Sequence, residues 1–471
     1  MAEIQYDFGM VGLGTMGRAL LLNMADHGFA VAGLDTDLGK VDALHSEGAG
    51  KPVKGFLDAD EFVASIRKPC AIMMLVPAGG PVDSVIHSLT PHLEEGDFLI
   101  DGGNSYFKDT DRRAKELTAL GLGFIGMGVS GGESGARHGP SMMPGGTVEN
   151  YERIRPIVEA IAAKYEGEPC VALVGSGSAG HYVKTVHNGI EYAVMQLISE
   201  VYDIMRRGLD MTNAEIADVF DQWNAAELQG FLVQITTTVL RFQDERTGKD
   251  LVDLISDKAK QKGTGKWTSQ DAMDLGTPIP TIDVAVAARE MSGLKDERVE
   301  ASKILHNTTT SYPYQKAAAV ADLRAALHTA LLISYAQGLA LLKEASKEYG
   351  YGTNLETVAK IWRAGCIIRS RSLETIRAAY TANPDLANLL VDPTIAADIL
   401  HNEDALRRVV IGAIQASIPA PSLSASIAYL DGYRSERLPA NLIQGQRDLF
   451  GAHTYERLDI EGSFHTHWEK L

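Results

Sequence analysis

The stretch Gly12-Leu-Gly-Thr-Met-Gly17 decides the fold of the first part of this chain. An apolar run over residues 5–11 precedes it, and a helical pattern over residues 18–26 follows it. In such a strand–turn–helix the first glycine permits a tight turn and the second lets the backbone approach a ligand, while the third lets helix and strand pack closely. The stretch therefore predicts the opening βαβ unit of a parallel sheet.

The same stretch predicts a dinucleotide site. Amide groups at the start of the following helix, together with the helix dipole, suit a pyrophosphate. A second apolar strand ends in Asp35, close to the ~20-residue offset at which a carboxylate binds the ribose. Asp37 is either a further ligand or only the cap of the next turn. The cofactor contacts predicted here are Gly12, Leu13, Gly14, Thr15, Met16, Gly17, Asp35, Thr36 and Asp37.

The acidic turn Asp35-Thr36-Asp37 favours NAD over NADP. A carboxylate accepts hydrogen bonds from both ribose hydroxyls of NAD but repels the 2′-phosphate of NADP. Arg and Lys, which normally receive that phosphate, do not occur between Asp35 and Gly39. We therefore expect an NAD-dependent oxidoreductase.

β-rich runs alternate with helical patterns up to about residue 175, which indicates a mostly parallel sheet. Glycine turns at 101–104 and 128–132 follow two of these runs, where open α/β sheets bind ligands. Helical periodicity then continues to about residue 430, and Thr212-Asn-Ala-Glu215 has capping-box spacing at a helix start. After residue 11 the predicted strands are residues 30–34, 71–76, 98–100, 124–129 and 171–174.

These patterns predict three parts. Residues 1–177 form a Rossmann-type α/β dinucleotide-binding domain, residues 178–437 a large all-α domain, and residues 438–471 a C-terminal tail. The most apolar stretch, residues 329–342, is interrupted by Ser334, Tyr335 and Gln337 and falls short of the roughly 20 residues that cross a bilayer. We expect it to be a buried helix.

Charge and cysteine content narrow the class of protein. The 44 Lys and Arg against 61 Asp and Glu give a net charge of −17, which argues against nucleic acid or an anionic membrane as partner. The first residues lack the basic and apolar regions of a secretory signal. Cys70, Cys170 and Cys366 are far apart, as expected of buried reduced thiols without a metal. A cytoplasmic location follows as an expectation.

A polar stripe follows the start of the helical part. Lys184, His187, Asn188 and Glu191 stand at i, i+3, i+4 and i+7, so one helix face carries all four. Apolar neighbours such as Val186 and Ile190 indicate a largely buried helix. A buried lysine and carboxylic acid two turns apart can divide base and acid work. A structural hydrogen-bond network is the alternative.

A second polar segment, Gln261-Lys-Gly-Thr-Gly-Lys266, interrupts the helical patterns. Two glycines between lysines form a loop whose amides and ammonium groups suit an anion. Solvated surface turns have the same composition, so both interpretations stay open from these residues alone.

Four runs, together with the stripe, resemble motifs of the 6-phosphogluconate dehydrogenases. They follow one another in the family's order, and the resemblance extends over essentially the whole chain. The resemblance implies oxidative decarboxylation of 6-phosphogluconate to ribulose 5-phosphate and carbon dioxide in the pentose phosphate pathway, without a metal. It also implies that residues 178–437 are the substrate and dimerisation domain of a homodimer in which each tail, residues 438–471, reaches into the other subunit. The runs are Asp101-Gly-Gly-Asn-Ser105, Gly128-Val-Ser-Gly-Gly-Glu133, Lys262-Gly-Thr-Gly-Lys-Trp267 and Asn441-Leu-Ile-Gln-Gly-Gln-Arg-Asp-Leu-Phe-Gly-Ala-His453.

The resemblance also implies roles for single residues. Lys184 matches the family's general base and Glu191 its general acid. Lys262, Thr264 and Arg289 match ligands of the substrate phosphate, joined by Arg447 and His453 from the partner's tail. The positions that match contacts to the sugar acid are Asn104, Ser130, Gly131, Gly132, His187, Asn188 and Tyr192. His465 and His467 match no site residue, and a solvated tail explains them.

The cofactor region departs from the family. NADP-linked members carry Asn-Arg-Thr where this chain has Asp35-Thr36-Asp37, and a common lysine near the adenosine is Pro77 here, in Val76-Pro77-Ala78. Asn104 and these three residues complete the predicted cofactor contacts. Both changes remove positive charge and favour NAD. The alternatives are an NADP-preferring version, a related β-hydroxyacid dehydrogenase that does not decarboxylate, and a non-catalytic NAD sensor.

Overall fold

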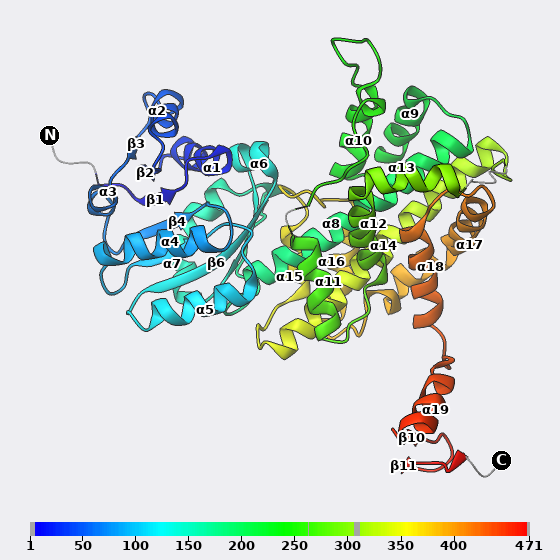
Figure 1. Ribbon diagram of the computed structural model, residues 1–471. Helices are drawn as coiled ribbons and strands as arrows, with labels where there is room; N and C mark the ends of the chain where they lie inside the picture. Colours follow the sequence, from blue (N-terminus) through cyan, green and yellow to red (C-terminus); the bar gives the residue numbers. More distant parts are fainter. Residues whose placement is uncertain (1–4, 262, 306–310, 469–471) are drawn as a thin grey trace. The chain divides into compact units, whose positions relative to one another are not determined.

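A seven-stranded sheet organises the first part of the computed structural model, which describes residues 5–261, 263–305 and 311–468 (Figure 1). The strand order is β3-β2-β1-β4-β5-β6-β7, and only the last pair, β6 with β7, is antiparallel. The strands are β1 (Phe8–Val11), β2 (Val31–Leu34), β3 (Val53–Phe56), β4 (Ala71–Met74), β5 (Phe98–Asp101), β6 (Gly123–Ser130) and β7 (Ser141–Gly145).

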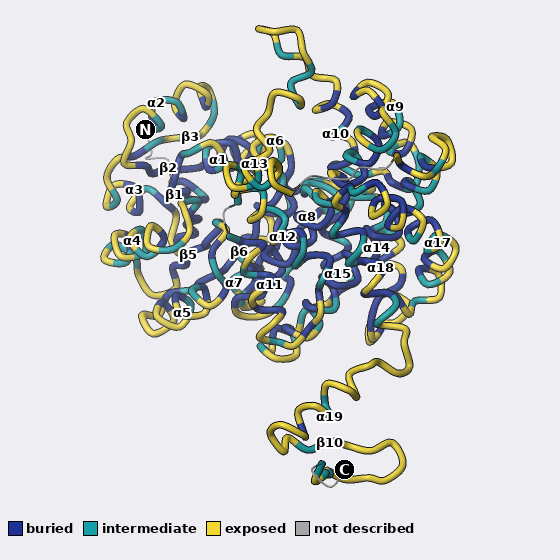
Figure 2. Tube along the Cα trace, turned by 45° about the vertical axis from the view of Figure 1, so that its right-hand side comes forward, coloured by how far each residue is buried: buried dark blue, intermediate teal, exposed yellow. Residues whose placement is uncertain are grey.

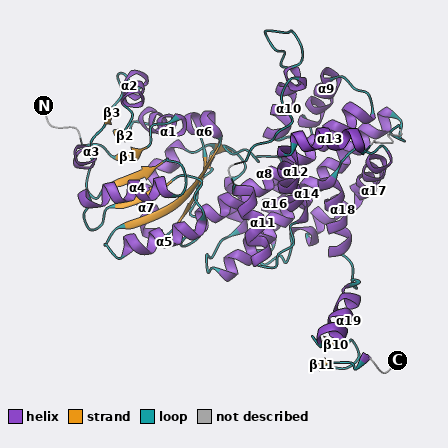
Figure 3. Ribbon diagram, viewed as in Figure 1, coloured by secondary structure: helices purple, strands orange, loops and turns teal. Residues whose placement is uncertain are grey.

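Helices cover both faces of this sheet, because successive strand residues point to opposite sides. In β4, Met73 belongs to an apolar cluster with Leu20 of α1, whereas Ile72 belongs to a second cluster with Phe62 of α3. The predicted Rossmann-type α/β fold is confirmed (Figure 3). The helices are α1 (Thr15–Asp26), α2 (Leu38–Glu47), α3 (Ala59–Ser65), α4 (Gly80–Leu89), α5 (Phe107–Thr118), α6 (Gly132–His138) and α7 (Val148–Ile161).

Three details of the sheet differ from the sequence predictions. The run 171–174 forms no strand; only Val171 makes an isolated bridge, to Met142 of β7, which already takes that sheet edge. Strands β3 and β7 were not predicted, since β3 is an edge strand and Ser-Met-Met-Pro-Gly in β7 has no β-branched residue. The predicted turn at 128–132 is also wrong in part, because β6 continues to Ser130.

A large helical part follows, as predicted. It begins with the 25-residue helix α8, and the capping box at Thr212 and Glu215 is present at the start of α9. A two-residue hairpin, β8 (Lys164–Tyr165) with β9 (Glu168–Pro169), precedes it. The helices are α8 (Ala179–Asp203), α9 (Asn213–Asn224), α10 (Phe231–Arg241), α11 (Thr264–Asp274), α12 (Pro280–Gly293), α13 (Lys295–Ile304), α14 (Lys316–Glu348), α15 (Leu355–Ile361), α16 (Ser372–Ala382), α17 (Pro393–Gln415) and α18 (Pro421–Tyr433).

The apolar stretch 329–342 lies within α14, which is 33 residues long and extends beyond the predicted stretch at both ends. By length and composition α14 could cross a membrane, yet 89% of its most apolar window is buried inside the fold (Figure 2). Its polar groups bond internally: Tyr335 donates to the Ile368 carbonyl and Gln337 to Thr281 Oγ1. The expected buried helix is therefore confirmed.

A glycine seam joins the sheet to α8, formed by Gly126 and Gly128 of β6, Gly145 of β7 and Gly180 of α8. A Cβ built on Gly180 would lie 2.1 Å from the Gly126 carbonyl oxygen, and one on Gly145 would lie 2.1 Å from the Gly180 nitrogen. Backbone therefore packs directly on backbone here, and a Cβ on Gly128 would lie 2.4 Å from Cβ of Lys184.

The chain separates into two compact units, residues 1–426 and 427–471. The second unit holds α19 (Ala440–Gly451) and a hairpin of β10 (Tyr455–Glu456) with β11 (Ser463–Phe464). Most of its described residues from 434 onward are exposed (Figure 2), whereas Ile427, Tyr429, Leu430 and Asp448 are buried. The Asp448 carboxylate accepts hydrogen bonds from the Thr454 and Thr466 amides and from Trp468 Nε1. His465 also contacts this carboxylate at 2.8 Å, while His465 and His467 are both exposed in the tail.

Candidate active site

The glycine loop has the geometry expected of a turn that meets a pyrophosphate. Gly12 adopts φ +95°, and a Cβ on Gly17 would lie 1.9 Å from the Gly12 carbonyl oxygen. A Cβ on Gly14 would meet nothing within 4 Å. Gly14 caps α1 without a side-chain hydrogen bond, so no side chain competes for the first amides of the helix. The glycine loop therefore leaves room for a phosphate group to approach the backbone amides at the start of α1.

Asp35 lies at the end of β2 and its carboxylate is held by three partners. Oδ2 accepts from the Leu13 amide at 2.8 Å and Oδ1 from the Asp37 amide at 3.0 Å. Lys40 Nζ lies 3.3 Å from both oxygens. Burial alone would raise the pKa of Asp35, but these hydrogen bonds and the ammonium group together hold it below its usual value. Asp35 is therefore a fixed negative charge beside the glycine loop.

Lys40 was not predicted, because it lies one residue beyond the turn that ends at Gly39. Asp37 caps α2, its Oδ1 accepting from the Gly39 amide at 2.9 Å. Of the two interpretations of Asp37, the structure therefore displays the cap. Thr36, between the two carboxylates, is exposed.

Two further loops follow adjacent strands. Residues 76–78 come after β4, with Val76 half-buried and Pro77 and Ala78 exposed; residues 102–105 come after β5. Strands β4 and β5 pair in register, Met74 opposite Asp101. Asn104 is exposed at the tip of the second loop. These predicted cofactor contacts thus share the carboxyl edge of the sheet with the glycine loop.

The polar stripe of α8 forms a connected cluster with His187 at its centre. His187 Nδ1 lies 3.4 Å from Lys184 Nζ, 3.2 Å from Asn188 Oδ1 and 3.8 Å from Glu191 Oε2. Its Nε2 lies 3.3 Å from the Ser130 hydroxyl at the end of β6. The structure therefore brings together five residues that the sequence predicted for one site.

Burial shifts both ends of the stripe toward their neutral forms. It lowers the pKa of Lys184, and the nearby Glu191 carboxylate opposes this only in part. It raises the pKa of Glu191 against the opposing charges of Lys184 and Arg289. Burial and the Lys184 charge hold the pKa of His187 well below its usual value. Burial therefore favours the neutral amine that a general base needs and the neutral carboxylic acid that a general acid needs.

Two buried residues that the sequence analysis did not assign to this site lie beside the polar stripe of α8. Trp362 packs edge-on against His187, with ring centroids 5.6 Å apart. Cys366 is fully buried near Lys184, and burial raises its thiol pKa to about 12. No periodicity links this segment to α8, so only the tertiary structure shows the contact. All three cysteines are buried and unpaired.

A second cluster gathers Tyr192, Arg289 and the start of α11. The Arg289 guanidinium stacks 3.6 Å from the Tyr192 ring centroid. A Cβ on Gly265 would lie 2.4 Å from the same ring, which places the neighbouring Thr264, the first residue of α11, close by. The loop predicted at 261–266 is therefore wrong in its second half, where a helix has begun. Lys262 lies outside the described residues.

The remaining predicted positions are not joined to these clusters by direct bonds. Gly131 and Gly132 form the start of α6 beyond Ser130, Gly131 with φ +126°. Arg447 and His453 belong to the second unit, where Arg447 donates to Gln444 and His453 packs against Phe450. Within the described ranges no group of three or more His, Cys, Asp or Glu side chains is placed to hold a metal.

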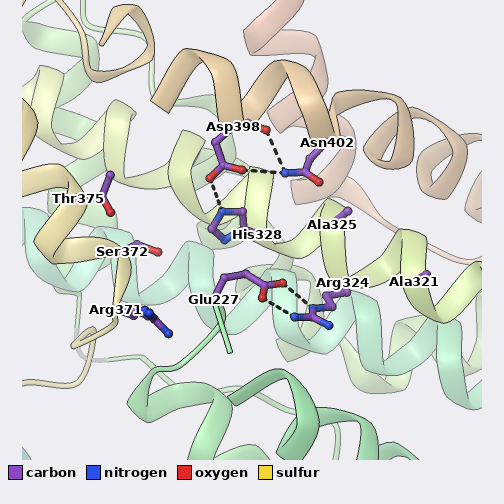
Figure 4. A pocket seen from close by; sticks show the side chains of 10 residues that line it. All are labelled: Glu227, Ala321, Arg324, Ala325, His328, Arg371, Ser372, Thr375, Asp398 and Asn402. Carbon is purple, nitrogen blue, oxygen red and sulfur yellow. Dashed lines mark hydrogen bonds and ion pairs between the residues drawn. The ribbon is translucent and has the colours of Figure 1, made fainter. Parts of the chain in front are cut away.

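A separate cavity of about 400 Å³ lies between α14, α16 and α17, and none of the predicted site residues line it (Figure 4). Four of its lining side chains pair with one another, Arg324 with Glu227 and His328 Nε2 with Asp398 at 2.7 Å, and Arg371 also lines it. Within each of these two pairs the side chains bond to each other, so neither pair offers a free positive charge to an anion.

Comparison with known proteins gives a consistent picture. The chain matches the family model for the NAD binding domain of 6-phosphogluconate dehydrogenase over residues 7–175 and that for its C-terminal domain over residues 180–468. It is 48% identical to a decarboxylating 6-phosphogluconate dehydrogenase of Oryza sativa, covering 98% of both chains. It is 49% identical to the NADP(+)-dependent enzyme of Bacillus subtilis, covering 98% of this chain and 99% of the relative.

One solved structure is similar over nearly the full length. The 6-phosphogluconate dehydrogenase of Plasmodium falciparum, solved without ligands, with NADP+ and with 6-phosphogluconate, superposes with a TM-score of 0.95 at 40% identity. The match covers 98% of this chain and 100% of that one.

Proposed function

The chain belongs to the 6-phosphogluconate dehydrogenase family, and from this premise we propose that it oxidatively decarboxylates 6-phosphogluconate to ribulose 5-phosphate and carbon dioxide with reduction of NAD. The observation that carries the proposal is the buried cluster on α8, where Lys184 and Glu191 flank His187 and burial favours the neutral form of each.

Lys184 is the general base of the proposed first step. Its neutral amine takes the proton from the C3 hydroxyl of the substrate as the C3 hydrogen leaves as hydride. The dinucleotide, when bound, supplies the acceptor of that hydride. The ammonium form of Lys184 then donates a hydrogen bond to the new C3 ketone and stabilises the enolate that forms as the carboxylate departs.

Glu191 is the general acid of the last step. Its raised pKa keeps a proton available, and that proton goes to the enediolate left by decarboxylation, at the carbon that becomes C1 of ribulose 5-phosphate. His187 lies between the two groups and touches Ser130 and Asn188, so we assign these three, with Asn104, Gly131, Gly132 and Tyr192, to the carboxylate and hydroxyls of the substrate.

The substrate phosphate is assigned to Lys262, Thr264 and Arg289, with Arg447 and His453 from the partner's tail in a homodimer. One feature supports the phosphate site and another the exchange of tails. Arg289 is already oriented by stacking on Tyr192, and guanidinium groups bind phosphate bidentately. On α19, beside Arg447, the apolar side chains of Leu442, Ile443 and Phe450 are 65%, 60% and 71% exposed, as expected of a surface that is covered in an assembly.

NAD rather than NADP is the proposed cofactor. Asp35 keeps its negative charge and its oxygens face the amide of the glycine loop. Lys40 neutralises this charge in part, so the discrimination against a 2′-phosphate is weaker than an isolated aspartate would give.

The division into a Rossmann-type domain (1–177), a helical domain (178–437) and a tail (438–471) is also part of the proposal. So are a cytoplasmic location, which the three separated cysteines favour, and the absence of membrane or nucleic-acid partners, which the net charge of −17 favours.

The deciding experiment incubates the protein with NAD and 6-phosphogluconate and measures carbon dioxide and NADH together. Equal molar amounts are expected. NADH without the gas would replace the proposal by a β-hydroxyacid dehydrogenase, and binding of NAD without turnover would leave a sensor. A higher kcat/KM with NADP than with NAD would refute the cofactor assignment alone.

A further inference from the structure

Arg113 is a charged residue that the proposed mechanism does not use, yet it is one of the most deeply buried side chains in the described chain. It lies on α5 and is 1% exposed. Burying a guanidinium is costly unless charged partners and hydrogen bonds compensate. Its partners therefore indicate what this position does.

One side of the guanidinium holds the loop after β4. Nη2 donates to the Gly79 carbonyl at 3.0 Å and to Asp83 Oδ2 at 3.1 Å, while Nε donates to Asp83 Oδ1 at 2.8 Å. Gly79 is the cap of α4 and Asp83 lies in its first turn. This grip fixes the end of the segment that carries Val76, Pro77 and Ala78.

The other side holds the loop after β5. Nη1 lies 3.4 Å from both Asp101 Oδ2 and Ser105 Oγ. Asp101 is completely buried and accepts from the Ser105 hydroxyl at 2.6 Å and from the Gly103 amide at 3.1 Å. The turn is thus fastened on both sides of Asn104, which is left exposed at its tip.

The same helix also contacts α8. Thr110 Oγ1 lies 2.7 Å from Nδ1 of the buried His181, one turn before Lys184. Helix α5 therefore touches both cofactor loops and the helix that carries the proposed base.

We propose that Arg113 is a positioning residue that sets the spacing of the two cofactor loops, and thereby the place from which the nicotinamide ring faces C3 of the substrate. The inference rests on the proposed function for the identity of the reaction, and on the two loops for the binding of the cofactor. It assigns Arg113 no contact with either ligand.

The test compares Arg113→Met and Arg113→Lys with Arg112→Ala. Arg112 is the neighbouring arginine; it contacts Asp83 in the first turn of α4 but neither the Gly79 carbonyl nor the loop after β5, and it is 43% exposed. Three quantities are measured: the Kd of NADH by fluorescence, the KM for the sugar-acid substrate, and the deuterium isotope effect on kcat with substrate labelled at C3.

For Arg113→Met we expect an increase of roughly tenfold in Kd and a fall of about 10²-fold in kcat, since misplacement by about 1 Å costs this much in rate. The isotope effect should rise as hydride transfer becomes limiting, while the KM for the sugar acid stays within about twofold. Arg113→Lys keeps the positive charge but lacks the planar guanidinium with its several N–H donors, so its Kd and kcat should lie between those of the wild type and Arg113→Met. Arg112→Ala should match the wild type.

A merely structural role would lower the amount of active enzyme and leave Kd and the isotope effect unchanged, which would overturn the proposal. If Arg113→Met does not fold, Ser105→Ala removes the 2.6 Å bond to Asp101 and the 3.4 Å contact with Arg113 Nη1 and should change the same two quantities in the same direction. The NADH titration needs no substrate, so it still decides the role of Arg113 if the proposed reaction fails.

Discussion

Lys184 on α8 and Asp35 after β2 are buried almost equally, with 6% and 8% of their surfaces exposed. Their charges nevertheless respond in opposite ways. Lys184 has His187 at 3.4 Å and loses part of its affinity for a proton, whereas two amides and an ammonium group keep Asp35 ionised. Burial makes a charge expensive, and the partners decide whether the group keeps it. The first environment suits proton transfer and the second a permanent charge.

The largest effect is expected from Lys184→Met. Loss of the base should lower kcat by about 10³-fold, within the range for a positioned acid or base, while NADH still binds. Steady-state assays with NAD and 6-phosphogluconate measure this. Lys347→Met, at an exposed position of α14, is the control. Unchanged turnover in Lys184→Met would remove the difference between the two environments.

The pH profile tests the same environment without removing the base. Activity needs neutral Lys184 and protonated Glu191, so it should be lost at low pH, where Lys184 is protonated, and at high pH, where Glu191 is ionised; burial lowers the pKa of Lys184 and raises that of Glu191. Glu191→Gln should lower kcat by about 10²-fold and abolish the alkaline limb. Glu344→Gln on the exposed side of α14 should keep both limbs. A retained alkaline limb in Glu191→Gln would reassign it to another group.

Glu200 is a third buried ionisable group, and it differs from Asp35 because all of its hydrogen-bond donors are neutral. Its carboxylate accepts from the Ser422 and Leu423 amides and from Gln196, yet burial raises its pKa from 4.5 to about 7. The folded state therefore binds the proton more tightly, and the free energy of unfolding should fall by about 3 kcal/mol as pH rises from 4.5 through 7. Urea unfolding across this range should show a flatter dependence for Glu200→Gln; identical slopes would contradict the assignment.

Asp35→Asn with Thr36→Arg should break the permanent charge. Hydrogen bonds to charged groups contribute about 1.5–3 kcal/mol, so the ratio of kcat/KM for NAD to that for NADP should shift toward NADP by roughly 10- to 100-fold. Asp42→Asn, an exposed carboxylate on α2, controls for a general change of charge. A ratio that stays constant would show that this turn does not select the cofactor.

The smallest effect is expected from Lys40→Met. Because Lys40 is 42% exposed, its pair with Asp35 is worth less than about 1 kcal/mol. Without the ammonium group the carboxylate should repel NADP more strongly, and kcat/KM for NADP should fall by roughly two- to fivefold while that for NAD changes less. An increase for NADP would mean that Lys40 does not offset Asp35.

Sequence patterns predicted those features whose structure is determined by residues close together along the chain. The glycine loop, the capping box at Thr212 and the stripe of α8 each follow from spacing along a single element. The resemblance, rather than spacing, drew attention to Arg289 and Arg447. Strand β7 was not predictable because its position depends on pairing with β6, and its composition is poor for a strand.

Contacts between distant segments account for the other omissions. Trp362 reaches His187 and Arg113 reaches Gly79 only through the tertiary fold. Lys40 lies one residue beyond the acidic turn, although its partner Asp35 was correctly predicted to be a key carboxylate of that turn. Sequence reasoning thus found the residues proposed to touch ligands more readily than those that hold them in place.

The glycine seam limits how this protein can be recombined. The two family models meet between residues 175 and 180, which suggests a convenient point for building chimaeras, but Gly180 packs its backbone on Gly126 and Gly145 across that point. Neither side leaves room for a methyl group on the other. An exchange of the first 177 residues with a relative should therefore give an active hybrid only if all four seam positions remain glycine, whatever the identity elsewhere. Modularity in the sequence does not extend to this interface.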